Sequence, residues 1–221
     1  NAKGQVLSTY TVEGAVNHDW EDIASFALHD RGYLLIADVG DNSGMRGAYT
    51  LYVVPEPAVD LRNRADRTPL KVGLAIGFRY EDGPHNCEAV AIDPGARAIF
   101  LVSKCAGPEC KVYALPLPKE SPREPLVAKP IAVLKLPVTT AMDLSPDGLR
   151  AIVLTYGDAF EYVRQPGETW SGAFARRPRA IPMPPRRQGE ALCYSPDGKT
   201  LYLTSEGSPM PFFEVPVVEP R

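Results

Sequence analysis

Two stretches of the chain place a histidine three residues before a glutamate that opens an apolar run. They are VNHDWEDIA, with His18 and Glu21, and GPHNCEAVAID, with His85 and Glu88. Carboxylates and imidazoles bind divalent cations and also transfer protons, so this pair of residue types could serve a metal site or acid–base chemistry. The two copies lie far apart along the chain, so the fold must bring them together before either chemistry can occur.

Two further copies of the glutamate segment follow later in the chain. Aligning EDIA, EAVA, MDLS and EALC places one set of residues in register: Glu21, Glu88, Met142 and Glu190. A second apolar run follows each copy, and the ends of these runs align another set: Asp38, Lys104, Tyr156 and Glu206. Repetition on this scale indicates one supersecondary unit that is copied along the chain.

Each copy continues with more short apolar segments. A third segment is rich in aromatic residues, as in LYVVPEP and VYALPLP, and three copies add a fourth, such as KVGLAIGFRY. Short β-branched and aromatic runs that alternate with turns such as SPDG are strands, and four strands per repeat is the pattern of a propeller blade. The sequence therefore predicts an all-β fold, a single β-propeller domain over residues 1–221 with four blades of four antiparallel strands.

The last copy has no fourth strand. The segment GQVLSTYTV, from Gly4, precedes the first copy and belongs to no complete blade. We expect it to pair with the last blade and close the ring, since this pairing would cover two exposed sheet edges. The long first copy leaves an alternative, in which PEPAVDLRNRADRTPLK contributes a degenerate fifth blade.

The SPDG turns followed by LYLT, the EDIA, EAVA and EAL strands and the DVGDN segment resemble bacterial secreted or periplasmic β-propellers. The likeness is to the esterase-like phytase group and to uncharacterised propellers with a DWED…GDN…SEG pattern, and it covers nearly the whole chain as a repeat pattern. The resemblance implies a periplasmic or secreted propeller, with metal-assisted hydrolysis of an ester or phosphoester as one activity.

The innermost strand of each propeller blade lines the axial channel, so the aligned glutamates should form a ring that Met142 completes. Carboxylates around a narrow axis repel one another unless a cation, water or a proton compensates. We therefore expect a divalent cation in the channel, with Ca²⁺ favoured over Mg²⁺, Mn²⁺ or Zn²⁺ because its preferred ligands are hard oxygens. The expected ligands are Glu21, Glu88, Glu190 and Asp38. The alternative is that the glutamates bond to backbone N–H groups of adjacent blades.

Two other sets of residues could bind a cation. Ligation by His18 or His85 would favour Zn²⁺ or Mn²⁺. The loop DVGDNSGMR resembles part of a calcium site but lacks the spacing of an EF-hand. Its candidate residues are Asp38, Asp41, Asn42 and Ser43. We favour the interpretation that the loop residues form a turn, in which their side chains bond the local backbone.

Charge and hydropathy exclude several classes of partner. The net charge of −3 lacks the basic excess of a nucleic-acid-binding protein, and we expect no nucleic-acid partner. No run approaches the roughly 20 apolar residues of a membrane span. We expect a monomer without a membrane span.

The four cysteines form neither a zinc framework nor a CxxC motif. Cys105 and Cys110 flank a Gly-Pro turn, which predicts a small disulfide-closed loop and hence an oxidising compartment. Cys87 and Cys193 lie on the predicted inner strands. We expect them to be separate buried thiols, with a bridge across the channel as the alternative.

Two classes of function remain. In the first, which we favour, the propeller is a binding module for a glycan, a peptide, an envelope protein or a small anionic ligand. Aromatic contacts could come from Trp20, Tyr156 and Trp170.

The alternative is a metal-assisted hydrolase of a small anionic ester, phosphoester or uronic sugar. In this interpretation the cation polarises a substrate oxygen and Lys104 stabilises the developing negative charge. Glu206 or His85 would then transfer a proton.

Overall fold

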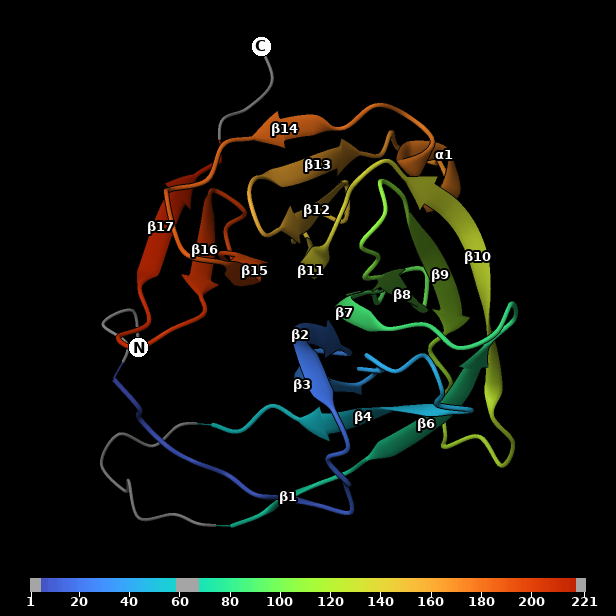
Figure 1. The fold of residues 1–221 in the computed structure, drawn as a ribbon. Coiled ribbons are helices and arrows are strands. Elements are labelled where there is room, and N and C mark those ends of the chain that lie inside the picture. Colours follow the sequence, from blue (N-terminus) through green and yellow to red (C-terminus); the bar gives the residue numbers. More distant parts are fainter. Residues whose placement is uncertain (1–4, 59–67, 218–221) are drawn as a thin grey trace.

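The computed structural model describes residues 5–58 and 68–217. Its regular structure is almost entirely β-strand, and the described residues contain a single short helix, α1 (Trp170–Phe174). Figure 1 shows the strands β2, β7, β11 and β15 gathered around a common centre, with the later strands of each repeat farther out. The predicted all-β propeller fold is confirmed.

The strands form four antiparallel units, which we number in chain order. Unit 1 contains β2 (Trp20–Leu28), β3 (Arg31–Asp38), β4 (Tyr49–Pro55) and β6 (Leu74–Tyr80). Unit 2 contains β7 (Cys87–Asp93), β8 (Ala98–Ser103), β9 (Cys110–Pro116) and β10 (Leu126–Leu134). Unit 3 contains β11 (Thr139–Leu144), β12 (Arg150–Thr155), β13 (Ala159–Val163) and β14 (Arg179–Ile181). Unit 4 contains β15 (Gly189–Tyr194), β16 (Thr200–Ser205) and β17 (Phe212–Pro216).

Apolar side chains fill the space between successive units. One cluster joins units 1 and 2, a second joins units 2 and 3 and includes α1, and a third joins units 3 and 4. The inner strands pack in the same order, β2 beside β7, β7 beside β11 and β11 beside β15. Strand β10 also pairs in parallel with β6, so the first two units share one eight-stranded sheet.

The N-terminal segment does not occupy the predicted position. Among its described residues, Val12–Glu13 (β1) pairs in parallel with Leu70–Lys71 (β5), and the described pairing of β17 is with β16 alone. The physical reason is an apolar surface on unit 1, where Val12 packs against a cluster that includes Tyr52 and Val54. The predicted ring closure is therefore wrong for the described residues. Gly4 and residues 59–67, where the fifth-blade alternative partly falls, lie outside them.

All four cysteines are free thiols, so the predicted disulfide is wrong. The Cys110 thiol donates to the carbonyl oxygen of Leu136 at 2.9 Å, while the sulfur of Cys105 lies 3.5 Å from the Ser103 hydroxyl. Cys87 is buried as predicted. Cys193 is exposed, contrary to the prediction, because it lies on a face of β15 that no neighbouring unit covers.

No helix in the described part of the chain has the length and apolar character needed to cross a membrane.

Candidate functional site

Every inner strand contains a β-bulge near its start. In unit 1, Trp20 pairs with Asp38 and Asp22 with Ala37, so Glu21 is an extra residue without a partner of its own. The same shift occurs in the other three units. The extra residues are Glu21, Glu88, Thr140 and Glu190. Because a bulge redirects the extra side chain, it explains how three glutamates turn away from the regular strand faces.

The strand pairing corrects the sequence alignment in unit 3. Thr140 occupies the glutamate position, and its hydroxyl donates to the carbonyl oxygen of Gly189 at 2.8 Å. Met142 lies two residues farther on and is buried in the apolar cluster between units 2 and 3, with 2% of its surface exposed. The expected ring is therefore completed by a threonine that is already hydrogen-bonded, not by Met142.

The strand pairing also separates Asp38 from the residues aligned with it. Asp38 pairs with Trp20 in the way that Ser103 pairs with Cys87. The structural equivalents of Asp38 are Ser103, Thr155 and Ser205. Lys104, Tyr156 and Glu206 follow these residues by one position, at the level of Val39.

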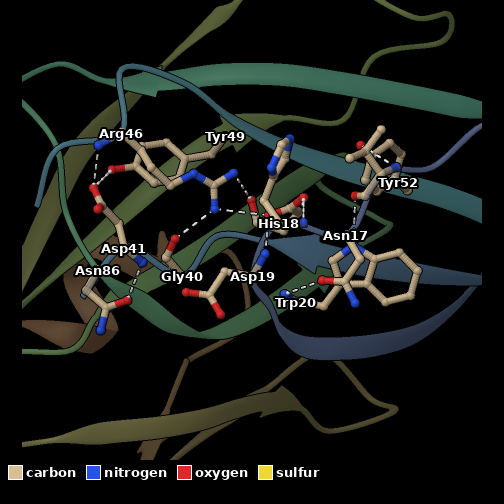
Figure 2. Close-up of polar contacts among 12 residues, drawn as sticks. Asn17, His18, Asp19, Trp20, Gly40, Asp41, Arg46, Tyr49, Tyr52 and Asn86 are labelled. Carbon is tan, nitrogen blue, oxygen red and sulfur yellow. Dashed lines mark hydrogen bonds and ion pairs between the residues drawn. The ribbon is translucent and has the colours of Figure 1, made fainter. Parts of the chain in front are cut away.

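Asp38 is fully buried and is engaged by its own unit. Its carboxylate forms an ion pair with Arg46 at 3.0 Å and accepts the backbone N–H groups of His18 and Asp19 at 3.1 Å each. Arg46 also donates to the carbonyl oxygen of Gly40 at 2.7 Å (Figure 2). These contacts give Asp38 a positioning role, because they fix the backbone that leads to Glu21.

Asp41 organises the loop that carries Arg46. It accepts hydrogen bonds from the backbone N–H groups of Met45 and Arg46 and from the hydroxyl of Tyr49, and its own N–H donates to Asn86 Oδ1 at 2.7 Å (Figure 2). Burial acts to raise the pKa of Asp41, but these hydrogen bonds outweigh it and lower the pKa to about 2. The turn interpretation is confirmed for Asp41, whereas Asp38 bonds the distant backbone of His18 and Asp19 and Asn42 Oδ1 accepts from the Asn86 side chain.

Asp19 and Glu21 place their carboxyl groups together over Gly40. A Cβ atom at position 40 would lie 2.3 Å from Asp19 Oδ2 and 2.5 Å from Glu21 Oε1, so the two carboxyls occupy the space that a side chain there would need. Burial raises the pKa of Glu21 to about 7, with further contributions from the charge of Glu88 and from Asp19, which hydrogen-bonds it, while Lys104 acts in the opposite direction. Near neutral pH, Glu21 is therefore protonated about half of the time.

Lys104 supplies the positive charge among the glutamates. Its ammonium group forms an ion pair with the carboxylate of Glu88, which is only 6% exposed. It also lies 4.8 Å from the centre of the Tyr156 ring, and Tyr156 is 38% exposed. Burial lowers the pKa of Lys104, but hydrogen bonds with Glu88 and Tyr156 outweigh it and raise the pKa. This lysine offsets part of the negative charge that the expected cation would also offset.

Glu190 belongs to the same group of charges. Burial raises its pKa, and Glu88 and Glu206 raise it further, whereas a hydrogen bond from Gln188 and the charge of Lys104 lower it. Glu206 itself is exposed at the rim. The structure thus brings together one set of side chains, which we call the entrance cluster: Asp19, Glu21, Glu88, Lys104, Tyr156, Glu190 and Glu206.

The histidines do not join the entrance cluster through any contact of the described residues. His85 Nε2 lies 3.0 Å from Asp82 Oδ1, and its ring packs against Tyr80 and Tyr113. His18 is exposed, and its backbone N–H rather than its ring contacts Asp38. Trp170 is also misassigned as a surface contact, because it is buried and its Nε1 donates to Asp93 at 3.0 Å.

Sequence reasoning missed Asp19. The signal was present in HDWED, where Asp19 lies two residues before Glu21, but strand alternation alone places such a pair on one face without showing that they touch. The bulge and the absence of a side chain at Gly40 bring the two carboxyls together.

No arrangement of three or more His, Cys, Asp or Glu side chains suited to a metal ion occurs within residues 5–58 and 68–217. The expected divalent cation stays a prediction.

The fold and the entrance cluster define a β-propeller in which glutamates from three inner strands lie near Lys104. No protein-family model and no curated protein matches the chain. Many solved structures are similar to it, and three of them illustrate the likeness. The β-propeller domain of Cps50 (Swd1) from Myceliophteria thermophila is 11% identical, with a TM-score of 0.48 over 90% of this chain and 54% of that chain. The periplasmic gluconolactonase PpgL of Pseudomonas aeruginosa is 15% identical, with a TM-score of 0.47 over 89% of this chain and 57% of that chain.

A putative 6-phosphogluconolactonase from Bacteroides uniformis is 16% identical, with a TM-score of 0.45 over 87% of this chain and 52% of that chain. The chain spans about half the length of these three structures. None of the similarities assigns an activity to it.

Proposed function

We propose that the protein is a periplasmic or secreted binding module that binds a glycan at the entrance cluster. The observation that carries the proposal is the convergence of three bulged glutamates around one lysine, beside the exposed ring of Tyr156. The periplasmic or secreted location follows from the sequence resemblance and stays a prediction.

The side chains of the entrance cluster can form the contacts with which proteins bind sugars. Carboxylates accept hydrogen bonds from neighbouring sugar hydroxyls, and an ammonium group donates to hydroxyl or ring oxygens. An exposed aromatic ring offers an apolar face to the C–H groups of a sugar ring. Tyr156 is 38% exposed and Trp20, next to Glu21 on β2, is 36% exposed, so both can make such a contact.

The balance of charge selects among glycans. Lys104 is already paired with Glu88, which leaves Glu21, Glu190 and Glu206 to face an incoming ligand. These carboxylates favour a neutral sugar or an amino sugar and repel a uronic sugar or a small anion. An anionic ligand, as the sequence analysis also expects, would need a divalent cation to bind first.

The test uses three oligosaccharides of equal length and different charge. We expect penta-N-acetylglucosamine and penta-glucosamine to bind in isothermal titration calorimetry at pH 6.5, and penta-galacturonate not to bind in the presence of a chelator. Tyr156→Ala and Glu190→Gln should each weaken binding about tenfold, the loss that one stacking or charged hydrogen-bond contact represents. Glu214→Gln, which removes one charge from an exposed position on β17, is the matched control.

Two outcomes would overturn this proposal. If none of the three oligosaccharides binds, a peptide or an envelope protein becomes the better ligand class. If only penta-galacturonate binds, and only with added calcium, the cation-dependent interpretation replaces it.

The hydrolase alternative has one specific observation in its favour. Asp19 and Glu21 place their carboxyl groups together over Gly40, and the pKa of Glu21 is raised to about 7, so Glu21 can take up and release a proton near neutral pH as a general acid or base does. Lys104 lies close enough to influence Glu21 and could stabilise a developing negative charge.

A hydrolase would show turnover that depends on this pair. The assay uses p-nitrophenyl acetate and p-nitrophenyl phosphate, with and without calcium, on the wild type and on Glu21→Gln. Hydrolysis that the substitution reduces by at least about a hundredfold would establish the alternative, since general acid–base catalysis contributes that much. Oligosaccharide binding without hydrolysis of either ester would leave the binding module as the function.

A further inference from the structure

A cavity of about 750 Å³ lies at the far end of the inner strands from the entrance cluster. Its walls include residues 23–27 of β2 and the ends of β7, β11 and β15 with the turns that follow them. Gly32, Glu56 and Arg164 also line it. The entrance cluster lies instead at the start of the same strands. The cavity is therefore separate from the proposed glycan site.

The cavity exists because two inner strands each have one uncovered face. Strand β7 is buried at all seven positions between its neighbours. In β2, by contrast, Ile23, Ser25 and Ala27 are exposed while Ala24 and Phe26 are buried, and in β15 Cys193 is exposed between two buried residues. Units 1 and 4 are the ends of the series, so these two faces border the cavity instead of another unit.

The walls are suited to an organic ligand. Ile23 is 58% exposed, an unusual value for a large apolar side chain on an inner strand, and Ala27, Pro146 and Pro196 extend the apolar lining. The volume falls in the range of about 300–1,000 Å³ that small-molecule sites occupy.

The charged groups at the cavity leave an excess of carboxylate. Among the described residues that line the cavity, Arg164 carries the positive charge, and its guanidinium group already has bonding partners. It forms an ion pair with Asp93 at 3.2 Å and donates to the carbonyl oxygen of Gly148 at 2.6 Å. It also lies over the ring of Trp170, 4.4 Å from the ring centre. Arg164 is thus not free to meet an anionic ligand.

Asp143 and Glu56 line the same cavity without a cation within ion-pair distance among the described residues. Asp143 accepts the backbone N–H groups of Leu144 at 2.9 Å and of Tyr194 at 2.8 Å, which hold its carboxylate in place. Glu56 Oε2 accepts a hydrogen bond from the Ser25 hydroxyl at 3.3 Å. Both carboxylates keep unused acceptor capacity, because an ionised carboxyl group has about four lone-pair sites.

We propose that this cavity binds a small amphiphilic amine, with its ammonium group on Asp143 and its apolar body against Ile23 and Ala27. A cation supplies the charge that the lining lacks, and an apolar body covers surface that is now exposed to water. Burial raises the pKa of Asp143 to about 6, so at pH 7.5 the group is mostly ionised and an ammonium partner offsets the cost of that charge.

The test compares three probes with the same ring and chain: 3-phenylpropylamine, 3-phenylpropanol and 3-phenylpropionate. In isothermal titration calorimetry at pH 7.5, we expect the amine to bind with saturation, the alcohol to bind at least tenfold more weakly, and the carboxylate not to bind. Equal affinity for amine and alcohol, or preference for the carboxylate, would overturn the proposal.

Variants locate the binding site. Asp143→Asn keeps an oxygen for the Tyr194 N–H and removes the charge, so it should weaken amine binding at least tenfold, whereas Glu214→Gln on β17 should not change it. Ala27→Leu should block the cavity, and Ala48→Leu, in an exposed loop, is its matched control.

Glu56→Gln provides a second charge variant if Asp143→Asn fails to give the wild-type circular dichroism spectrum. Amine affinity that is the same in wild type, Ala27→Leu and the folded charge variant would contradict the assignment.

Discussion

The carboxylate of Asp22 in β2 accepts a hydrogen bond from the backbone N–H of Val90 in β7, at 2.7 Å. Asp143 in β11 makes the equivalent contact with Tyr194 in β15, at 2.8 Å. Each aspartate therefore ties the inner strand of one unit to the inner strand of the next. The expected alternative, in which carboxylates bond backbone N–H groups of adjacent blades, is thus met by aspartates and not by the glutamates.

Burial of the Asp143 carboxyl group, against the opposite effect of its backbone hydrogen bonds, predicts that stability falls as pH rises. Burial raises the pKa of Asp143 from 3.8 to about 6 in the folded protein. A raised pKa means that its contribution to stability is complete below the unfolded value near 4 and is lost as pH rises through about 6. The loss is at most roughly 3 kcal/mol, the equivalent of two pKa units. Asp143→Asn should reduce the fall in the free energy of unfolding between pH 4 and 8, measured by urea denaturation. A fall as large as that of the wild type would contradict the prediction.

The opposite dependence is expected from Asp82. Burial acts to raise its pKa, but hydrogen bonds from Lys111, His85 and Tyr113 outweigh it and lower the pKa to about 2. The contribution of Asp82 to the free energy of unfolding is therefore present above the unfolded pKa near 4 and is lost as pH falls towards 2. Asp82→Asn should lower the melting temperature at pH 7 and make no difference at pH 2. Asp30→Asn, at an exposed turn, is the control; a difference that persists at pH 2 would mean that the effect is steric.

Gly40→Ala should disrupt the entrance cluster. The new methyl group would lie within 2.5 Å of the carboxyl oxygens of Asp19 and Glu21, so one of them must move. We expect a loss of about 1–3 kcal/mol in the free energy of unfolding, as for other overpacked sites, together with weaker oligosaccharide binding. Gly47→Ala, in the same loop with open space around its Cβ position, is the matched control. Equal stability of the two variants would show that the carboxyls are not held over Gly40.

Lys104→Met should leave the Glu88 carboxylate buried without its partner. Breaking a buried ion pair in this way costs about 3–5 kcal/mol in fully buried sites, and we expect less here because Lys104 is partly exposed. Glu88→Gln should recover part of the loss when combined with Lys104→Met. Chemical denaturation of the wild type, both single variants and the double variant forms a complete cycle, and purely additive effects would exclude coupling between the two residues.

The same lysine variant gives the sharpest test of the predicted cation. Removing Lys104 leaves Glu21, Glu88 and Glu190 without the positive charge that now lies among them. If the entrance can hold a divalent ion, 5 mM calcium should raise the melting temperature of Lys104→Met more than that of the wild type, because a ligand stabilises the state that binds it. Magnesium, manganese and zinc serve as comparisons. No shift with any of the four ions in either protein would end the metal hypothesis.

Much of the architecture is readable from the sequence because its causes are local. The segments YLLIADVG, AIFLVSKC, AIVLTYGD and LYLTSEGS each fall on the second strand of a unit, and the SPDG turns connect first and second strands in units 3 and 4. Alternating apolar residues and turn residues act over a few positions, so their effect does not depend on distant parts of the chain. The convergence of Glu21, Glu88 and Glu190 follows from the same repeat.

Other features depend on contacts between distant residues. Val12 pairs with Leu70 of β5 and not with the last unit, because the apolar surface around Tyr52 and Val54 covers its side chain. The bulge that puts Thr140 in place of Met142 at the entrance leaves no mark in the periodicity of the sequence, because one extra residue can be inserted at more than one point of an apolar run.

The chain by itself determined which residues form strands and that three glutamates recur at one point of the repeat. Only the tertiary structure decided how their charges are balanced. Lys104 meets Glu88, and Asp19 meets Glu21 over Gly40, because bulged strands and a missing side chain bring these groups within reach. Such pairings depend on distances between side chains of different strands, and spacing along a sequence does not specify those distances.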